Sequence, residues 1–447
     1  MGKLFGTDGI RGKVGGEINK DMGLKLGRAL VDFCRSNGIP PRILIGRDTR
    51  ESGAMLIDAV TYGIMSTGGE EIVVGVIPSP GLAFLTKAGE FGLGLMITAS
   101  HNDASFNGFK IFNFQGEKLG QEDEKKIEEL IETPPPPTLG DIYKSGKGWV
   151  FNDEMGKYRK QLLDALPEDF NTQGLRVAID CAQGATYKIA PVLFGRAGCN
   201  VIALNNEPDG KNINENCGSE HPEKIKGEVS RTKAALGLAF DGDGDRVIAV
   251  DEKGNLLNGD HLLYIFAKML LEKGELINNL VVSTVMSNLG LVSALEELGI
   301  SHIYTPVGDH EVFKKMKECG AVLGGEEAGH IIFSQYGSSG DGMLCGLKLL
   351  EAMKSYDKPL SELAKEVSLY PKILVNVPVK SKPEFAGVPE IDKIIKETEG
   401  HFGENGRVVV RYSGTEPLCR VMIEGREKEE AEKYAHKIAE AIKSKLS

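Results

Sequence analysis

The chain has 447 residues, enough for about three domains of roughly 150 residues that bury their own cores without disulfides or metals. Its 64 acidic residues exceed its 53 Lys and Arg residues, giving a net charge of −11, so the surface as a whole repels nucleic acid and anionic membranes. Hydrophobic residues at 41% and charged residues at 26% exclude a largely disordered or fibrous chain. We therefore expect no nucleic-acid partner and no membrane partner.

We expect a cytoplasmic protein, because the sequence shows no secretion signal and its cysteines are not arranged for disulfides. The N-terminal sequence MGKLFGTDGIRG has no apolar signal core. The uncharged stretch from Leu276 to Leu295 is interrupted by Asn, Ser and Thr, which predicts a buried strand and helix rather than a membrane span. The seven cysteines are an odd number without a CxxC pair, so we expect reduced thiols.

Short apolar runs alternate with stretches of helical period along most of the chain, the pattern of an α/β protein with βαβ units. The first block predicts a helix at 52–65 and strands at 43–45, 72–74 and 92–98. The next two blocks predict strands at 175–179, 236–240, 247–250, 281–282, 303–304 and 322–323. Four prolines at 134–137 predict a surface connector.

The last block has a different character. Strands are predicted at 373–377, 408–410 and 421–423, and a helix follows them. Its apolar face consists of Ala435, Ile438, Ile442 and Leu446. We expect a smaller domain with its own sheet and helix.

The strongest chemical signal is DGDGDR at residues 241–246. Its carboxylates, Asp241, Asp243 and Asp245, alternate with glycines that let the backbone turn and bring the oxygens toward one point. Three such carboxylates repel one another, so a Mg²⁺-type ion is the natural compensating charge. The alternative is a plain acidic hairpin turn.

A calcium EF-hand is the other metal site considered for this segment, because Glu252 stands at the twelfth position of the loop. The sixth position requires glycine but holds Arg246, and the flanking sequences resemble strands rather than helices. These two features argue against calcium sensing.

The pentapeptide TASHN at 98–102 follows an apolar strand that ends in Ile97. Ser100 therefore lies at the carboxyl end of a sheet, where α/β proteins bind ligands, and is a candidate nucleophile. Its neighbour His101 is a further candidate, although adjacent residues rarely form a nucleophile–base pair and no GxSxG elbow is present. Lys110 adds a nearby cation; an ordinary loop turn with a surface lysine is the alternative.

RYSGTEP at 411–417 places a guanidinium, two hydroxyls and a flexible backbone in one loop between two strands. Arg411, Ser413, Gly414 and Thr415 suit a phosphate monoester, because Arg offers a forked donor and successive amides can form an anion nest. An ordinary hairpin connection is the alternative.

GGEEAGH at 324–330 puts Glu326 and His330 on a glycine-rich loop, where they can bond sugar hydroxyls or move protons. FGTDGIRG at 5–12 and GRDTR at 46–50 place arginines beside glycines. Surface ion pairing explains these arginines equally well.

Taken together and in order, FGTDGIRG, TASHN, DGDGDR, GGEEAGH and RYSGTEP closely resemble the α-D-phosphohexomutase family over essentially the whole chain. GSEHPE at 218–223 and RVMIEG near the end are most similar to the phosphoglucosamine mutase branch. The resemblance implies an α/β fold of four domains around a central cleft. Three are related α/β domains with mixed sheets, and the fourth is a smaller α+β phosphate-binding domain. We place the domains at 1–153, 154–254, 255–368 and 369–447.

The resemblance also implies a role for each motif. Ser100 would carry a phosphoryl group, and Asp241, Asp243 and Asp245 would hold one Mg²⁺ against it. Arg246, Lys110 and Arg11 would be further cations, with Lys110 or His330 transferring protons. The loop with Glu326 and Ala328 would recognise sugar hydroxyls. The phosphate that is not transferred would be gripped by Arg411, Ser413, Gly414 and Thr415, on a fourth domain that acts as a mobile lid.

The implied reaction interconverts glucosamine 6-phosphate and glucosamine 1-phosphate through phospho-Ser100 and a bisphosphorylated sugar, which also serves as activator. Phosphomannomutase/phosphoglucomutase activity is the close alternative. A Mg²⁺-dependent sugar phosphatase and a non-catalytic sugar-phosphate sensor are the alternatives from other classes. The resemblance leaves a homodimer open.

Two positions depart from the family pattern. Ala328 stands where the sugar-recognition loop usually carries serine, so one hydrogen bond to the sugar is missing, which affects discrimination between sugars. Asp309-His310 replaces an Asp-Arg pair common in the glucosamine branch, which removes a permanent cation.

Overall fold

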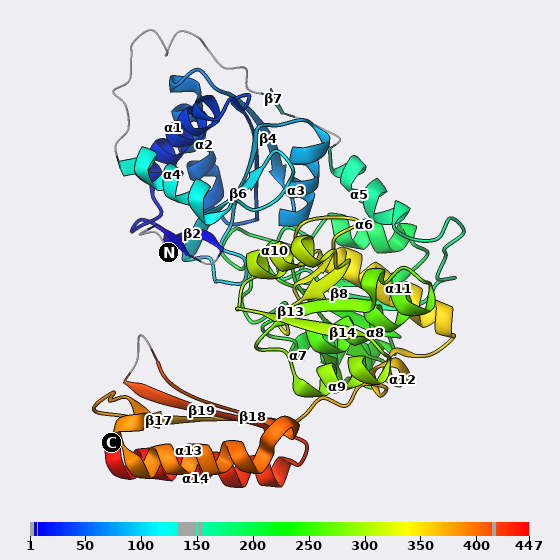
Figure 1. The fold of residues 1–447 in the computed structure, drawn as a ribbon. Coiled ribbons are helices and arrows are strands. Elements are labelled where there is room, and N and C mark those ends of the chain that lie inside the picture. Colours follow the sequence, from blue (N-terminus) through cyan, green and yellow to red (C-terminus); the bar gives the residue numbers. More distant parts are fainter. Residues whose placement is uncertain (1–3, 7, 133–148, 151–153, 414–416, 447) are drawn as a thin grey trace. The chain divides into compact units, whose positions relative to one another are not determined.

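The structure is a computed structural model that describes residues 4–6, 8–132, 149–150, 154–413 and 417–446 (Figure 1). The larger of two compact units contains Met1–Met286 and Ser301–Ala364, and the smaller contains Ser287–Ile300 and Lys365–Ser447. The predicted connector at 134–137 lies outside the described residues. Among the described residues, no helix has both the length and the apolar character that a membrane span needs.

The first sheet of the larger unit has seven strands in the order β1-β2-β6-β5-β3-β4-β7. Their bounds are β1 Phe5–Gly6, β2 Gly9–Lys13, β3 Arg42–Arg47, β4 Glu70–Val76, β5 Leu93–Ile97, β6 Phe106–Asn113 and β7 Trp149–Val150. β3 is parallel to β4 and β5, whereas β6 is antiparallel to β5 and β2. Arg47 pairs with Ile97, so the loops after β3 and β5 leave the sheet side by side.

Helices cover both faces of this sheet (Figure 1). They are α1 Lys20–Ser36, α2 Ser52–Ser66, α3 Ser79–Ala88 and α4 Gln121–Glu132. Ile43 and Ile45 of β3 pack in one core with α1, α2 and α4, while Leu44 between them packs in the other core with α3. This alternation is the two-residue period of a strand buried on both faces.

The contact between α1 and α2 depends on glycines. A β-carbon at Gly27 would lie 2.2 Å from Val60 O, and one at Gly63 would lie 2.3 Å from Leu24 O. The two backbones can therefore touch only where side chains are absent. α2 begins directly after the loop that follows β3, so this close packing also fixes the end of that loop.

The second sheet has the order β12-β11-β10-β8-β9. Its strands and helices are β8 Arg176–Asp180, β9 Asn200–Leu204, β10 Leu236–Phe240, β11 Val247–Asp251, β12 Leu256–Leu257, α5 Glu154–Asp164, α6 Ile189–Arg196 and α7 Glu223–Thr232. β10 and β11 are antiparallel, and Phe240 pairs with Val247, so DGDGDR is the connection of a hairpin. The strands predicted at 236–240 and 247–250 are confirmed.

The third sheet has the order β14-β13-β15-β16. Its elements are α8 Gly259–Glu272, the 3₁₀ helix η1 Ile277–Asn279, β13 Leu280–Thr284, β14 Ser301–Thr305, α10 Asp309–Cys319, β15 Leu323–Gly325, β16 Ile331–Phe333, α11 Gly342–Tyr356 and α12 Leu360–Ala364. β15 and β16 form an antiparallel hairpin in which Gly325 pairs with Ile331. The loop of this hairpin carries Glu326 and His330 at its ends.

The smaller unit has a three-stranded antiparallel sheet in the order β17-β19-β18. Its elements are α9 Leu289–Glu297, β17 Lys372–Pro378, η2 Phe385–Gly387, α13 Pro389–Phe402, η3 Gly403–Asn405, β18 Gly406–Tyr412, β19 Leu418–Gly425 and α14 Lys428–Leu446. The four apolar residues predicted for the last helix are buried in this unit's core. Buried Glu424 joins α9 to the sheet, because it accepts a hydrogen bond from Leu289 N at 2.5 Å and pairs with Arg407.

Candidate active site

The loop after β5 holds Ser100 in an uncommon backbone conformation. Its φ of 50° lies in the left-handed region, which non-glycine residues adopt only where the surroundings enforce it. The amide of Ser100 donates to Thr98 Oγ1 at 2.9 Å, and the residue is fully buried in the structure. Ser100 is therefore a strongly constrained residue rather than part of a loose loop turn.

Ser100 meets the hairpin loop of the second sheet. Its Oγ donates to Asp241 Oδ2 at 2.7 Å. A β-carbon at Gly242 would lie 2.5 Å from Ser100 O, so the glycine lets the two loops touch. Two loops predicted separately from the sequence form one site.

The carboxylates of Asp241, Asp243 and Asp245 form a buried group whose ligand oxygens all lie within 4.8 Å of one another. Burial, followed by the charges of Asp245 and Asp243, raises the pKa of Asp241 well above its ordinary value. Asp243 Oδ1 and Asp245 Oδ1 are buried and have no hydrogen-bond partner. A hard divalent cation fits this set, because it would satisfy the unpartnered oxygens and offset the repulsion.

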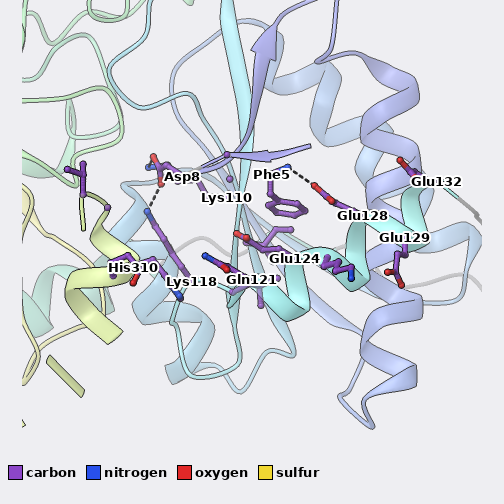
Figure 2. A pocket seen from close by; sticks show the side chains of 18 residues that line it. Phe5, Asp8, Lys110, Lys118, Gln121, Glu124, Glu128, Glu129, Glu132 and His310 are labelled. Carbon is purple, nitrogen blue, oxygen red and sulfur yellow. Dashed lines mark hydrogen bonds and ion pairs between the residues drawn. The ribbon is translucent and has the colours of Figure 1, made fainter. Parts of the chain in front are cut away.

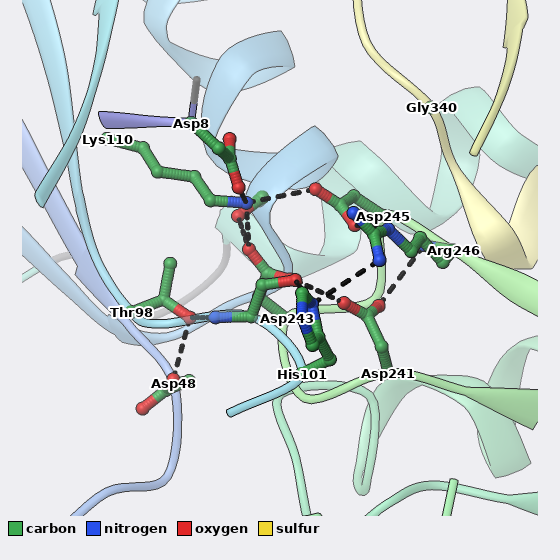
Figure 3. Close-up of polar contacts among 12 residues, drawn as sticks. Asp8, Asp48, Thr98, His101, Lys110, Asp241, Asp243, Asp245, Arg246 and Gly340 are labelled. Atoms are coloured by element: carbon green, nitrogen blue, oxygen red, sulfur yellow. Dashed lines mark hydrogen bonds and ion pairs between the residues drawn. The ribbon is translucent and has the colours of Figure 1, made fainter. Parts of the chain in front are cut away.

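Lys110 supplies the positive charge beside these carboxylates (Figure 3). Its Nζ lies 2.8 Å from Asp243 Oδ2, 3.0 Å from Asp245 Oδ2 and 3.1 Å from Asp8 Oδ2. Burial alone would lower the pKa of Lys110, but these three carboxylates raise it well above the ordinary value. Lys110 is only 1% exposed, which excludes the surface-charge alternative.

Arg246 and His101 lie on the side of the site next to Asp241 (Figure 3). The Arg246 amide donates to Asp241 Oδ1 at 3.1 Å, and its guanidinium Nη1 lies 3.3 Å from His101 Nδ1. Burial, then the charges of Arg246 and Arg11, lowers the pKa of His101. His101 Nδ1 lies 3.4 Å from Ser100 Oγ, so the adjacent pair does touch in this loop.

His330 reaches the same carboxylates from the third sheet. Its Nδ1 lies 3.7 Å from Asp245 Oδ1, and its Nε2 accepts the Gly340 amide at 2.8 Å. Burial alone would lower the pKa of His330, but Asp245 and Asp309 raise it above the ordinary value. His330 is 2% exposed and is fixed by both ring nitrogens.

Asp8, Lys118 and Asp309 form a chain of charges that the sequence patterns did not single out as a site. Lys118 Nζ pairs with both Asp8 and Asp309. Asp309 Oδ2 lies 3.4 Å from His330 Nε2. Although burial acts in the opposite direction, Lys110 and Lys118 hold the pKa of Asp8 well below its ordinary value. These residues connect the first sheet to the start of α10.

A pocket of about 580 Å³ lies beside this chain of charges (Figure 2). One part is lined by Asp8, Lys110 and Lys118, and another by the acidic face of α4. Burial, and then the charge of Glu128, raises the pKa of Glu124 to about 7. Glu128 itself accepts the amides of Leu4 and Phe5 at 2.7 and 2.8 Å, which fixes β1 against α4.

The loop between β15 and β16 is joined to the aspartate hairpin. Gly329 has φ 87°, its carbonyl accepts the Val247 amide at 3.1 Å, and a β-carbon there would lie 2.1 Å from Val247 O. Glu326 is half-buried, and its Oε1 accepts the Gly308 amide at 3.1 Å. Ala328 is exposed. The loop therefore presents Ala328 to solvent from a fixed base.

The remaining candidates belong to other segments of the chain. Arg11 pairs with Asp8 and donates to Asn102 Oδ1 at 3.4 Å, at the rim of the serine loop. Arg411 and Ser413 belong to the smaller unit, where Arg411 is exposed and Ser413 is buried, with its amide donating to Leu418 O at 2.8 Å. Gly414 and Thr415 lie outside the described residues.

Sequence reasoning missed the residues behind Ser100. From the sequence, ion pairing at the surface was enough to explain the charged residues of GRDTR. In the structure, Asp48 and Arg50 do pair with each other, but both are completely buried. Asn214, in the connection between β9 and α7, donates to the carbonyl of Ser100 at 2.8 Å. The sequence offered one signal, which is that GRDTR and TASHN each come at the end of a predicted strand. The parallel pairing of β3 with β5 brings both motifs to the same sheet edge.

All four domains of the phosphoglucomutase/phosphomannomutase family match the chain. The α/β/α domain I matches residues 2–136, domain II matches 157–254, domain III matches 258–370 and the C-terminal domain matches 374–441. Together they cover most of the sequence in the order expected from the motifs.

Curated relatives match over the full length. A phosphoglucosamine mutase from Syntrophus aciditrophicus is 47% identical, and the match covers 100% of each chain. One from Geobacillus thermodenitrificans is 46% identical, covering 100% of this chain and 99% of the relative.

Solved structures agree in fold. A phosphoglucomutase/phosphomannomutase family protein from Burkholderia thailandensis has a TM-score of 0.78 at 22% identity, covering 98% of this chain and 97% of its own. An N-acetylphosphoglucosamine mutase from Aspergillus fumigatus, in complex with GlcNAc-6P and magnesium, has a TM-score of 0.67 at 17% identity, covering 100% and 96%. With its four matched domains and its full-length relatives, the chain belongs to the α-D-phosphohexomutase family and is an isomerase of the mutase type.

Proposed function

We propose that the chain interconverts glucosamine 6-phosphate and glucosamine 1-phosphate through a phosphoserine at Ser100. The observation that carries the proposal is the hydrogen bond of 2.7 Å from Ser100 Oγ to Asp241, within a buried group of three carboxylates and Lys110. A hydroxyl in that position is next to groups that can manage the charge of a phosphoryl transfer. The full-length relatives named phosphoglucosamine mutase support the choice of sugar.

Asp241, Asp243 and Asp245, with an oxygen of phospho-Ser100, would hold one Mg²⁺. When bound, the ion supplies Lewis-acid charge that stabilises the transferring phosphoryl group. The donor set is all oxygen, which suits Mg²⁺, and the two unpartnered carboxylate oxygens are available for it.

In the forward direction, the bond from phosphorus to Ser100 Oγ breaks and a bond from phosphorus to the free sugar hydroxyl forms. The resulting glucosamine 1,6-bisphosphate turns around and returns its other phosphate to Ser100. The attacking sugar hydroxyl gives its proton to a base in the first half-reaction, and the same residue returns that proton to the leaving sugar oxygen in the second; Lys110 or His330 would take this role. The Ser100 proton leaves along the hydrogen bond to Asp241, and the reverse reaction uses the same groups in opposite roles.

The other residues would bind and orient the substrate. Arg246, held next to His101, and Arg11 would add positive charge near the phosphoryl group, and His330 would orient Asp245. Glu326 and the loop around Ala328 would contact sugar hydroxyls. The second phosphate would be bound by Arg411, Ser413, Gly414 and Thr415 on a lid-like fourth domain. Domain boundaries near residues 153, 254 and 368 and a cytoplasmic location are parts of the same proposal.

The test is a coupled assay that compares glucosamine, glucose and mannose 6-phosphates, with Mg²⁺ and a catalytic amount of hexose 1,6-bisphosphate. We expect the highest kcat/KM for the glucosamine substrate, and phosphate release far slower than isomerisation. A large preference for mannose or glucose phosphate would replace the proposal with phosphomannomutase/phosphoglucomutase activity. Release of inorganic phosphate as the main product would identify a phosphatase, and ligand binding without turnover would identify a sensor.

A further inference from the structure

We propose that Arg50 and Asn214 are positioning residues that hold the Ser100 loop in its reactive shape; the inference rests on the function proposed above. Arg50 lies in the loop after β3 and is 0% exposed. A fully buried arginine is rare unless all of its donors have acceptors, so the acceptor of each N–H group shows what the side chain supports.

All five N–H donors of the Arg50 guanidinium have acceptors. Nε donates to Asp48 Oδ2 at 2.9 Å. Nη2 donates to Ser100 O at 3.1 Å and Asn102 O at 2.7 Å. Nη1 donates to Phe106 O at 2.9 Å and also to Asp103 O. Four carbonyls of the serine loop therefore converge on one side chain.

Asp48 links this guanidinium to the amide of the serine itself. Its Oδ2 accepts from Thr98 Oγ1 at 2.7 Å, and Thr98 Oγ1 accepts from the Ser100 amide at 2.9 Å (Figure 3). Both the amide and the carbonyl of Ser100 are thus tied to the Asp48–Arg50 pair. This network fixes the residue at both peptide groups, which is what a left-handed φ requires.

Asn214 holds the same loop from the second sheet's domain. Its Nδ2 donates to Ser100 O at 2.8 Å and to Asn102 O at 2.8 Å. Each of these carbonyls therefore receives one bond from Arg50 and one from Asn214. Asn214 contacts neither the three aspartates nor Ser100 Oγ in the described hydrogen bonds, so its effect on the reaction would act through the loop.

The two groups of residues therefore have different roles. Asp241, Lys110 and their neighbours act on the phosphoryl group, whereas Arg50 and Asn214 determine where Ser100 Oγ lies. Lysine cannot replace Arg50, because it has three donors without a planar fork and so leaves at least two of the five hydrogen bonds unmade. A shift of the order of 1 Å in a reacting atom lowers rates by up to about 100-fold.

The experiment follows phosphorylation of Ser100 by glucose 1,6-bisphosphate with intact-protein mass spectrometry, together with kcat and KM for glucosamine 6-phosphate. The variants are Arg50→Lys and Asn214→Gly; glycine suits the Asn214 φ of 59° and removes only the amide. The control is Lys348→Gln, which removes another buried cation that donates to a backbone carbonyl, Ala165 O at 2.6 Å, away from the site.

We expect Ser100 phosphorylation and kcat to fall at least about tenfold in Arg50→Lys, and less in Asn214→Gly, with KM within about twofold of the wild type. Lys348→Gln should lose thermal stability but phosphorylate Ser100 at the wild-type rate. An unchanged phosphorylation rate in folded Arg50→Lys, or a loss matched by the control, would overturn the inference. If Arg50→Lys does not fold, Asn214→Gly decides, because it leaves every Arg50 bond in place.

Failure of the inference can be told from failure of the proposed function. A wild-type protein that never becomes phosphorylated at Ser100 would contradict the function. If the wild-type protein is phosphorylated at Ser100, and Arg50→Lys and Asn214→Gly are phosphorylated at the same rate as the wild type, only the positioning role is contradicted.

Discussion

Ser100 Oγ lies 2.7 Å from Asp241 Oδ2, although 141 positions separate the two residues in the chain. The contact joins the loop after β5 to the hairpin between β10 and β11. Among the described contacts, Ser100 has the only hydroxyl of the TASHN loop that touches the aspartate group. Five predictions test this site and the structure around it.

Ser100→Ala should lower mutase activity by at least about 1,000-fold, because in the proposed mechanism Ser100 carries the phosphoryl group between the half-reactions. The fold should persist, since the change removes one side-chain hydrogen bond to Asp241. Activity and thermal unfolding measure the two effects. Ser105→Ala, an exposed hydroxyl in the same loop, is the matched control and should keep wild-type activity. Appreciable turnover by Ser100→Ala would refute the phosphoserine mechanism.

Mg²⁺ should raise the Tm of the wild-type protein by a few degrees, because under the proposal it binds the folded carboxylate group in preference to the unfolded chain. Asp243→Asn should remove most of this increase, and chelation with EDTA should reverse it. Differential scanning fluorimetry at constant ionic strength gives the readout without any turnover. Asp164→Asn, an exposed aspartate on α5, should retain the full increase. An equal Mg²⁺ effect in both variants would place the ion elsewhere.

Gly242→Ala should impair both folding and activity, because its β-carbon would lie 2.5 Å from Ser100 O and 2.8 Å from Asn214 Nδ2. We expect a loss of about 1–3 kcal/mol in the free energy of unfolding, as for overpacking elsewhere. Gly227→Ala on α7 is the control, since a β-carbon there meets nothing within 4 Å and alanine favours helix. Equal stability of the two variants in urea unfolding would show that the hairpin has room to move.

Asp341 should make stability depend on pH. Burial raises the pKa of Asp341 to about 6, even though Tyr158 donates to it at 2.6 Å. As pH rises from about 4 to about 6, the unfolded chain loses this proton before the folded protein does, so unfolding becomes easier. Relative to Asp341→Asn, which keeps the cap of α11, the wild type should lose roughly 1–3 kcal/mol of unfolding free energy over that range.

Urea unfolding of wild type and Asp341→Asn at about pH 4 and about pH 7 measures the difference. The Asn variant stays neutral, so its stability relative to the wild type should increase with pH. A relative stability that is the same at both pH values would mean that Asp341 is ionised throughout.

Ala328→Ser tests the sugar loop. Ala328 is exposed, so serine fits without strain, and its hydroxyl can restore a bond to the sugar. One such bond corresponds to about a two- to tenfold change in the ratio of kcat/KM values between hexose phosphates. The ratio for glucosamine, glucose and mannose 6-phosphates is the measurement. Identical ratios in both proteins would show that this position does not read the sugar.

Much of the fold could be predicted because local patterns and tertiary structure agree. The strands around DGDGDR are β10 and β11 as expected, and the last helix buries the four residues whose spacing marked its apolar face. The clustering of the three aspartates followed from their spacing, since alternate residues in a tight connection converge.

The network behind Ser100 could not be predicted in the same way. Arg50 carries no pattern that separates it from a surface arginine, because its burial depends on carbonyls of a loop that begins about 50 residues later. Asn214 lies in an irregular segment, and its φ of 59° follows from the surrounding fold rather than from local propensity. Lys118 is recognised only once α10 brings Asp309 beside it.

The sharing of Ser100 O between Arg50 and Asn214 limits how such an enzyme can be recombined. A chimera that takes its first domain from one homologue and its second from another inherits two halves of a single backbone support. A working chimera would therefore need segment 46–50, segment 98–106 and Asn214 from the same homologue, although these residues lie far apart in the sequence.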